Sequence, residues 1–373
     1  MTFAYPEVIE ANGVRLRHPR VEDAPEVRRA FDDEATIRFL ASVREPTLEF
    51  AEEWCTTGAA AVRAEGGIRY LAVDSKTDAV VAAASLRRVQ ADRAQAEIGY
   101  WVAPWARGNG LAKSVVRALS TAAFEAGLVR IELCVEWENV ASQRVALASG
   151  YRREGVRRSA AARLDSERYD LIAYVRLATD PGDPIRPGLP PLPGGRLSDG
   201  VVTVRPERLD DVADLVALLA LPEVAETNFG DASPEALARK CARSEALWLA
   251  GDRAAMIIED AETGAFAGDI GFHYFMPFLQ EGMIGYSLRP EFRGRGFTTR
   301  AVRLVAQWAF EHAGVARLIA GTDPKNVASQ KVLQRAGFER EAYMRDRMPA
   351  EDGGRQDDIQ WVLLPENRRR PVD

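Results

Sequence analysis

Two short glycine loops, each opened by an arginine, stand at matching places in the two halves of the chain. The first reads Arg-Gly-Asn-Gly-Leu-Ala at residues 107–112, and the second reads Arg-Gly-Arg-Gly-Phe-Thr at residues 293–298. Each loop follows a strand-like run and leads into residues with helical spacing. The first N–H groups of a helix lack backbone partners, and the helix dipole favours an anion there. Both loops therefore indicate a site for a phosphate or diphosphate group.

Two common nucleotide-binding motifs do not fit these loops. A P-loop ending in Lys113 and Ser114 needs glycine at the positions that Arg107 and Ala112 occupy. A dinucleotide fingerprint starting at Gly108 needs glycine where lysine 113 stands. Kinase and dehydrogenase activities therefore lose their main support.

The elements around the loops occur twice, so the chain contains two copies of one fold. Residues 15–27 parallel 202–215, residues 97–112 parallel 283–298, and residues 138–155 parallel 325–342. A long repeat used only twice is unlike a solenoid, which stacks several short repeats. The run 181–195 is mostly proline and glycine and is interpreted as the linker. We predict domains at 1–178 and 200–366, a linker at 179–199 and a tail at 367–373.

The elements within each copy alternate between strand and helix patterns. In the first copy we expect strands at 15–17, 70–73, 80–86, 97–102 and 131–135. A helical region begins near Asp23, a second helix runs from Leu111 to Gly127, and a third is capped by Asn139 and ends at Gly150. The second copy repeats this order. Each half is therefore predicted to be α/β, with a mixed sheet.

The composition excludes several classes of protein. Hydrophobic residues make up 47% of the 373 residues and charged residues 28%, as in ordinary soluble proteins. The net charge of −6 gives no basic surface for nucleic acid. The three cysteines form no CxxC pair, so neither a disulfide framework nor a metal site is expected. Without a signal peptide pattern or a long apolar run, the chain is expected to be cytoplasmic and not bound to a membrane. It is expected to be a monomer or a homodimer.

The ordered motifs resemble the GNAT acyltransferase superfamily, and within it the RimJ/RimL-like branch. The superfamily signature, Arg/Gln-x-x-Gly-x-Gly/Ala, is matched in the first copy by Arg107, Gly110 and Ala112. In the second copy Thr298 departs modestly from this signature. The Asn-x-x-Ser and Gly-aromatic motifs that follow also occur twice: Asn139 with Ser142, Asn326 with Ser329, Gly150 with Tyr151, and Gly337 with Phe338.

This resemblance implies two GNAT-like domains in tandem and an N-acyltransferase that uses acetyl-CoA or another acyl-CoA, without a metal. The acceptor would be a primary amine of a small molecule or of a peptide N-terminus. It also implies the residues that hold the cosubstrate. These are Trp101, Val102, Ser287 and Leu288 beside the pantetheine arm, Asn139 and Asn326 at the next helix, and the pyrophosphate loops formed by Arg107, Gly108, Asn109, Gly110, Leu111, Ala112, Arg293, Gly294, Arg295, Gly296, Phe297 and Thr298.

Acyl transfer to an amine needs a proton acceptor for the amine and a proton donor for the leaving thiolate. Glu97 is the candidate base, with a solvated strand-end carboxylate as the alternative. Ser142 and Ser329 are candidate donors, with simple hydrogen bonding in the first helical turn as the alternative. Met283 stands in the place of Glu97 in the second copy and cannot accept a proton, although Glu281 points to the same strand face. The N-terminal domain is therefore favoured as the catalytic one.

Other interpretations stay open at this point. His273 lies in an aromatic strand, where a core or cleft-wall role competes with that of a general base. Tyr343 is either a proton donor or an ordinary packed tyrosine. The chain as a whole can also be a non-catalytic protein that binds or senses acyl-CoA, or can catalyse in its C-terminal domain with the N-terminal one in support.

Overall fold

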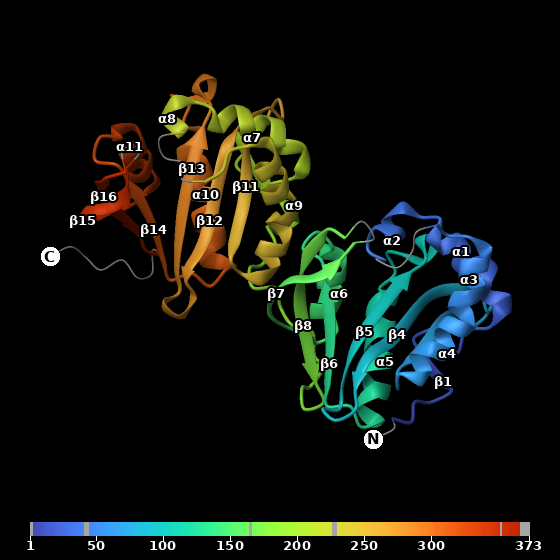
Figure 1. Ribbon diagram of the computed structural model, residues 1–373. Coiled ribbons are helices and arrows are strands. Elements are labelled where there is room, and N and C mark those ends of the chain that lie inside the picture. The colour runs from blue at the N-terminus through green and yellow to red at the C-terminus, as the bar shows by residue number, and fades with distance from the viewer. Residues whose placement is uncertain (1–2, 41–44, 164–165, 226–229, 351–352, 366–373) are drawn as a thin grey trace. The chain divides into compact units, whose positions relative to one another are not determined.

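The computed structural model describes residues 3–40, 45–163, 166–225, 230–350 and 353–365 (Figure 1). The chain divides into two compact units, Met1–Arg186 and Pro187–Asp373. Within the described residues, each unit contains one eight-stranded sheet flanked by helices. The prediction of an α/β fold with a mixed sheet in both halves is confirmed.

The sheet of the N-terminal unit is antiparallel except between two central neighbours, β5 and β6, which run parallel. The central strands β3 and β4 are apolar and mostly buried on both faces, whereas the edge strand β7 is mostly exposed. In their order across the sheet the strands are β1 (Val8–Ala11), β2 (Val14–Arg17), β3 (Ile68–Asp74), β4 (Val80–Gln90), β5 (Gln95–Val102), β6 (Arg130–Val135), β8 (Arg168–Leu177) and β7 (Arg152–Ala162).

Helices cover both faces of this sheet. The apolar side chains of α1 and α3 form a core with β3, β4 and β5 in which Phe31 packs edge-on against Trp101, their ring centroids 5.3 Å apart. Tyr100, the neighbour of Trp101 on β5, points to the opposite face and contacts α6. The helices are α1 (Ala24–Phe31), α2 (Glu34–Arg38), α3 (Leu48–Cys55), α4 (Thr57–Ala64), α5 (Leu111–Glu125) and α6 (Val140–Ala148).

The sheet of the C-terminal unit repeats this topology, with β13 and β14 as its parallel pair. In their order across the sheet the strands are β9 (Leu197–Ser198), β10 (Val202–Pro206), β11 (Arg253–Asp260), β12 (Phe266–Met276), β13 (Glu281–Leu288), β14 (Arg317–Thr322), β16 (Arg355–Leu363) and β15 (Glu339–Pro349).

Two apolar cores lie on the two faces of this second sheet. Met256 and Ile258 of β11 pack into the core that contains the α10 side chains, whereas Ile257 between them packs with α7 and α9. This alternation assigns each strand residue to one face. The helices are α7 (Val212–Leu219), α8 (Pro222–Ala225), α9 (Pro234–Ala250), α10 (Phe297–Glu311) and α11 (Val327–Ala336).

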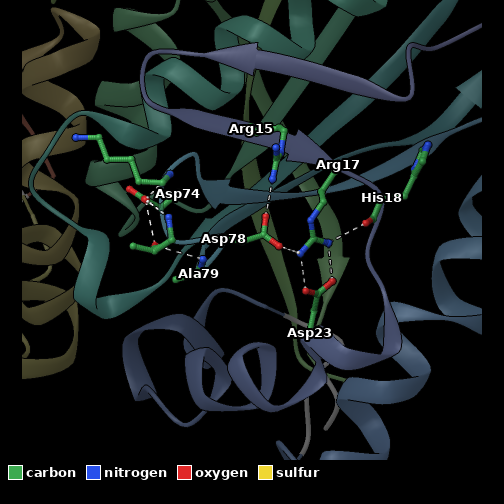
Figure 2. A network of polar contacts seen from close by, with 9 residues as sticks. Arg15, Arg17, His18, Asp23, Asp74, Asp78 and Ala79 are labelled. Carbon is green, nitrogen blue, oxygen red and sulfur yellow. Dashed lines mark hydrogen bonds and ion pairs between the residues drawn. The ribbon is translucent and has the colours of Figure 1, made fainter.

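A buried ion pair anchors the start of the first helix in each unit. Arg17 donates two hydrogen bonds of 2.8 Å to Asp23 (Figure 2). The Asp23 carboxylate also accepts from the Arg20 N–H at 2.7 Å. Arg205 and Asp211 repeat this bidentate pair in the C-terminal unit, at 2.8 and 2.7 Å. The charge pair therefore fixes the same strand-to-helix turn twice.

The proline- and glycine-rich segment is shared between the two units. Ile185 donates its N–H to Leu147 O at 2.8 Å within the N-terminal unit. Leu189 and Leu192 are buried in the core of the C-terminal unit, and Trp248 Nε1 donates to Pro190 O at 2.9 Å. The residue just before 186 thus contacts the N-terminal unit, and the residues after 187 pack against the C-terminal unit.

Candidate functional site

The central parallel strands of each unit separate after three paired residues. β5 pairs with β6 from Gln95↔Arg130 to Glu97↔Glu132, although β5 continues to Val102. In the C-terminal unit the pairing likewise stops at Met283↔Ile319. Beyond these points, one edge of β5 and of β13 has backbone groups without a strand partner among the described residues.

The alternation of backbone hydrogen bonds shows which residues face this unpaired edge of β5. Residues that exchange hydrogen bonds with a neighbouring strand alternate along an antiparallel pair. The Ala103 N–H donates to Val81 O at 2.9 Å, so Trp101 also faces the β4 side. The backbone groups of Tyr100 and Val102 then face the unpaired edge.

The same reasoning applies to β13. The Arg289 N–H donates to Ala267 O at 2.8 Å, so Ser287 faces β12, while Tyr286 and Leu288 face the unpaired edge. Of the four strand residues that we predicted beside a pantetheine arm, Val102 and Leu288 present their backbone there. The backbone groups of Trp101 and Ser287 do not.

The two glycine loops leave open space at the mouths of α5 and α10. Gly108, Gly110, Gly294 and Gly296 have φ values of 85°, 71°, 75° and 80°, which glycine adopts without strain. A Cβ atom added to any of the four would meet no atom within 4 Å among the described residues. Among the described residues no side chain caps either helix, so the first N–H groups are available to an anion. The loops therefore fit a diphosphate.

The arginines that open the loops hold them to the rest of each unit. Arg107 donates to Asp33 and to Thr36 Oγ1 of the α2 region, both at 2.6 Å, and to Val102 O at 3.3 Å. The Arg107 guanidinium holds the pKa of Asp33 below its usual range. Arg293 pairs with Glu223 of α8 at 2.7 Å. Both arginines therefore position the loop.

The other predicted loop residues divide into exposed and packed ones. Asn109 is exposed, whereas Leu111 and Ala112 are half-buried in the first turn of α5. Phe297 and Thr298 are buried in the first turn of α10. Arg295 pairs with Asp260 at 3.0 Å and lies over the ring of Phe297.

A cavity of about 520 Å³ extends from the loop of the C-terminal unit along α10. Gly296 stands at its edge, and Arg300, Arg303 and Arg335 supply positive charge to its wall. Arg300 is paired with Asp199 at 2.7 Å. A basic cavity that begins at a helix mouth can hold further phosphate groups of one ligand.

A tyrosine–serine pair joins the central strand of each unit to the helix that follows the separated strands, and the sequence analysis missed both tyrosines. Tyr100 of β5 donates its hydroxyl to Ser142 Oγ of α6 at 3.0 Å. Tyr286 of β13 lies 2.9 Å from Ser329 Oγ of α11 in the same arrangement. Burial raises the pKa of both tyrosines to about 12, so both hydroxyls keep their protons. The shared Ile-Gly-Tyr motif was the available signal.

The asparagines expected near the cosubstrate cap the helices that carry these serines. Asn139 Oδ1 accepts from the Ser142 N–H at 3.1 Å, and Asn326 Oδ1 accepts from the Ser329 N–H at 3.0 Å. These caps fix each serine at the first turn, under the tyrosine hydroxyl. The structure therefore brings the Asn, Ser and Tyr of each unit together.

Glu97 is buried on the opposite face of β5 and is paired with two arginines. Its Oε2 accepts from Arg88 at 2.7 Å, and its Oε1 lies 3.5 Å from Arg87. The Arg87 guanidinium also lies over Gly99, where an added Cβ would be 2.7 Å from Nη2. Glu97 thus belongs to an ion-pair cluster that covers the middle of β5.

Neither a metal-ligand cluster nor a membrane-spanning helix occurs among the described residues. Among the described residues, no three His, Cys, Asp or Glu side chains gather as metal ligands. The described helices also include none with the length and apolar character to cross a membrane.

Comparisons with known proteins place the two units in one family. Residues 14–152 and 202–339 each match the family model described as "Acetyltransferase (GNAT) domain". Two Bacillus relatives match part of the chain. The "Probable N-acetyltransferase YjcK" of Bacillus subtilis is 34% identical over 91 residues, which are 24% of this chain and 50% of that protein. The "Uncharacterized N-acetyltransferase p20" of Bacillus licheniformis is 28% identical over 149 residues, 39% of this chain and 83% of that protein. The chain spans about half the length of the curated relatives it matches first.

Solved structures resemble about half of this chain, the size of one unit. Mycobacterium smegmatis RimJ, in complex with CoA-disulfide, is 22% identical with a TM-score of 0.44, covering 50% of this chain and 93% of that one. A ribosomal-protein-S5-alanine acetyltransferase from Vibrio fischeri is 20% identical with a TM-score of 0.43, covering 47% and 99%.

Proposed function

The chain belongs to the GNAT acetyltransferase family, and on this premise we propose that it transfers an acetyl group from acetyl-CoA to a primary amine. The acceptor is an amine of a small molecule or of a peptide N-terminus. The observation that carries this proposal is the pair of open glycine loops at the mouths of α5 and α10, each beside an unpaired strand edge.

The residues at these loops fit coenzyme A. The diphosphate would lie against the N–H groups of α5 or α10, where no Cβ atom stands in the way. The amide groups of the pantetheine arm would pair with the backbone of Val102 or Leu288. Arg300, Arg303 and Arg335 would contact further phosphate in the C-terminal unit. When bound, the thioester supplies an activated carbonyl carbon for attack by an amine.

The tyrosine–serine pairs supply a proton at the strand separation. Because Tyr100 and Tyr286 keep their protons well above neutral pH, each can donate through its serine to a sulfur atom that acquires negative charge. The capping asparagines hold the serine in place for this step.

Calorimetry and a thiol-release assay test the proposed function on the full chain. We expect acetyl-CoA to bind and free thiol to appear when tyramine or alanine amide is added as the acceptor. No uptake of acetyl-CoA at millimolar concentration would overturn the proposal. Uptake without thiol release from any amine would leave a protein that only binds acyl-CoA.

Separate charge reversals at the two loops count the working sites. Arg107→Glu and Arg293→Glu each place a carboxylate beside the carboxylate that the arginine now pairs with. We expect each variant to remove one equivalent of bound acetyl-CoA. Arg158→Glu, an exposed arginine outside both loops, is the matched control and should bind as the native chain does.

A further inference from the structure

Two glycines face each other in the middle of the C-terminal sheet, on the face that α7 and α9 cover. Gly271 of β12 and Gly285 of β13 are direct cross-strand partners. Gly285 is exposed and lies beyond Met283, where the pairing of β13 with β14 ends, and a Cβ added there would meet no described atom within 4 Å. We call Gly271 and Gly285 the glycine patch. The Gly285 side of this patch is open, whereas Gly271 is buried beside Arg253 and His273.

The same place in the N-terminal unit is filled. Its cross-strand pair is Ser85 and Gly99, and the guanidinium of Arg87 lies against Gly99. Trp101 and Ala83, on one side of this pair, belong to an aromatic core. Only the C-terminal copy therefore has room over the strand that carries the acyl-transfer site.

Polar side chains border the glycine patch at both ends. His273 pairs with Met283 across the strands, and its Nε2 lies 3.9 Å from the Cβ position of Gly271. Arg253 Nη2 is 3.7 Å from that position. At the other end, Asp269 pairs with Ser287. Met283 stands in the second copy where Glu97 stands in the first. His273 is therefore the cross-strand neighbour of the position that corresponds to Glu97.

Three side-chain atoms near the glycine patch are shielded from solvent and have no hydrogen-bond partner in the part of the chain that the structure describes. They are Asp269 Oδ1, Arg253 Nε and Glu207 Oε1, all among the described residues. Glu207 is otherwise paired with Lys240 at 3.0 Å. Buried polar atoms without partners are rare in folded proteins, and a ligand that supplies the missing partners is one explanation for them.

We propose that the glycine patch of the C-terminal unit receives the acceptor amine and that His273 takes its proton. This inference rests on the proposed acetyl transfer and moves its chemistry to the C-terminal unit. The amine enters as its neutral free base, the unpartnered Oδ1 of Asp269 hydrogen-bonds it, and Gly285 lets it approach the strand edge without a side chain between. Arg253 hydrogen-bonds an oxygen of the acceptor.

The proton and electron balance of the step is complete. The amine nitrogen forms a bond to the carbonyl carbon of the acyl-CoA thioester, and the carbon–sulfur bond breaks. The nitrogen proton goes to Nε2 of His273, and the leaving sulfur takes a proton from the Tyr286–Ser329 pair. Amide and free thiol are the products, and the two side chains exchange protons with water.

His273 is held in the form that can accept a proton. Burial lowers its pKa to about 4, and the positive charges of Arg253 on β11 and Lys240 on α9 add to the effect. The side chains of Asp269 and Glu207 lie in the same region, and burial raises the pKa of Asp269. The imidazole is therefore neutral at pH 7. A nitrogen bonded to the tetrahedral carbon is far more acidic than a free ammonium, so a weak base can remove its proton.

His273→Gln tests the proton acceptor, with His312→Gln, an exposed histidine, as the matched control. We expect kcat with tyramine or alanine amide to fall at least 100-fold for His273→Gln, with acetyl-CoA affinity unchanged by calorimetry. His312→Gln should stay within twofold of the native chain. Proton NMR gives a readout independent of turnover. The imidazole resonance that His273→Gln removes should keep its neutral shift from pH 8 to pH 5 and move when the amine is added.

Gly285→Val tests the glycine patch even if the histidine variant does not fold. Its side chain would fill open space, so we expect KM for the amine to rise at least tenfold while acetyl-CoA still binds. Gly155→Val, at another strand glycine with open space around it, is the control. Native kcat in His273→Gln and native KM in Gly285→Val, with an active native chain, would overturn this inference alone. A native chain that releases no thiol would instead overturn the proposed function.

Discussion

At the scale of single residues, the serine hydroxyl groups at the strand separation have a partner that the sequence motifs did not suggest. Ser142 and Ser329 are parts of a tyrosine–serine pair rather than isolated donors. The tyrosine comes from the central strand and the serine from a capped helix. The pair therefore joins two elements that are far apart in sequence.

Tyr286→Phe should lower kcat about 100-fold, because the leaving sulfur loses its proton donor, while acetyl-CoA binding is retained. Tyr100→Phe removes the equivalent hydroxyl from the N-terminal unit and serves as the comparison. If turnover takes place in the C-terminal unit, Tyr100→Phe should change kcat less than threefold. A larger loss in Tyr100→Phe than in Tyr286→Phe would place the chemistry in the first copy.

At the scale of elements, the loop-to-helix junction needs glycine for two separate reasons, backbone conformation and room for a ligand. Gly296 has φ of 80° and open space around it, and it directly precedes Phe297, the first residue of α10. A turn in the same unit gives a comparison for the first reason alone, since Gly264 has φ of 71° and equally open space.

Gly296→Ala and Gly264→Ala should each lose about 1 kcal/mol of unfolding free energy, because alanine is strained at positive φ. Only Gly296→Ala should also weaken acetyl-CoA binding, by at least tenfold, because its methyl group enters the diphosphate site. Chemical denaturation and calorimetry separate the two effects. Equal affinity in both variants would argue against diphosphate binding at this loop.

The buried ion pair at the first helix makes a second prediction at this scale. Asp211→Ala leaves Arg205, whose side chain is 14% exposed, with Glu259 at 2.6 Å as its remaining charged partner among the described residues, so we expect a loss of about 3 kcal/mol in unfolding free energy. Asp214→Ala removes a carboxylate that is half exposed and should cost less than 1 kcal/mol. Urea denaturation of both variants measures the difference.

Sequence patterns were sufficient for the duplicated fold, because strand alternation, helix caps and glycine stops are local signals that occurred twice. They were insufficient for the acceptor side of the site. Whether Glu97 is free or paired depends on Arg87 and Arg88, and whether Gly285 is open depends on the strand and helices that pack near it. Such contacts come from register and packing across strands. The roles of Glu97, Ser142 and the loop residues stay predictions.

At the scale of the whole molecule, buried tyrosines link stability to alkaline pH. Burial raises the pKa of Tyr5, Tyr70, Tyr100, Tyr174 and Tyr286 to about 12, above the usual value of about 10. A group whose pKa is raised on folding stabilises the protein fully below its unfolded pKa. That contribution is lost as the pH rises towards the folded pKa.

We therefore expect the melting temperature to be level from pH 8 to about pH 9.5 and to fall steadily from pH 10 to pH 12. Tyr100 and Tyr286 are the buried tyrosines of the two tyrosine–serine pairs. Each should account for on the order of 2 kcal/mol of the unfolding free energy lost at alkaline pH. The Tyr100→Phe and Tyr286→Phe variants should show a shallower fall in differential scanning calorimetry. An identical slope in the variants and the native chain would contradict this assignment.

The side chain of Arg87 makes the space over the central strand differ between the two copies. Its guanidinium closes in the first copy the space that is vacant in the second, and nothing else among the described atoms comes within 3 Å of the Cβ position of Gly99. Trimming that one side chain would uncover Gly99 and leave Glu97 with Arg88 alone. An Arg87→Ala variant would therefore open space over Gly99 of β5 like the space over Gly285 of β13.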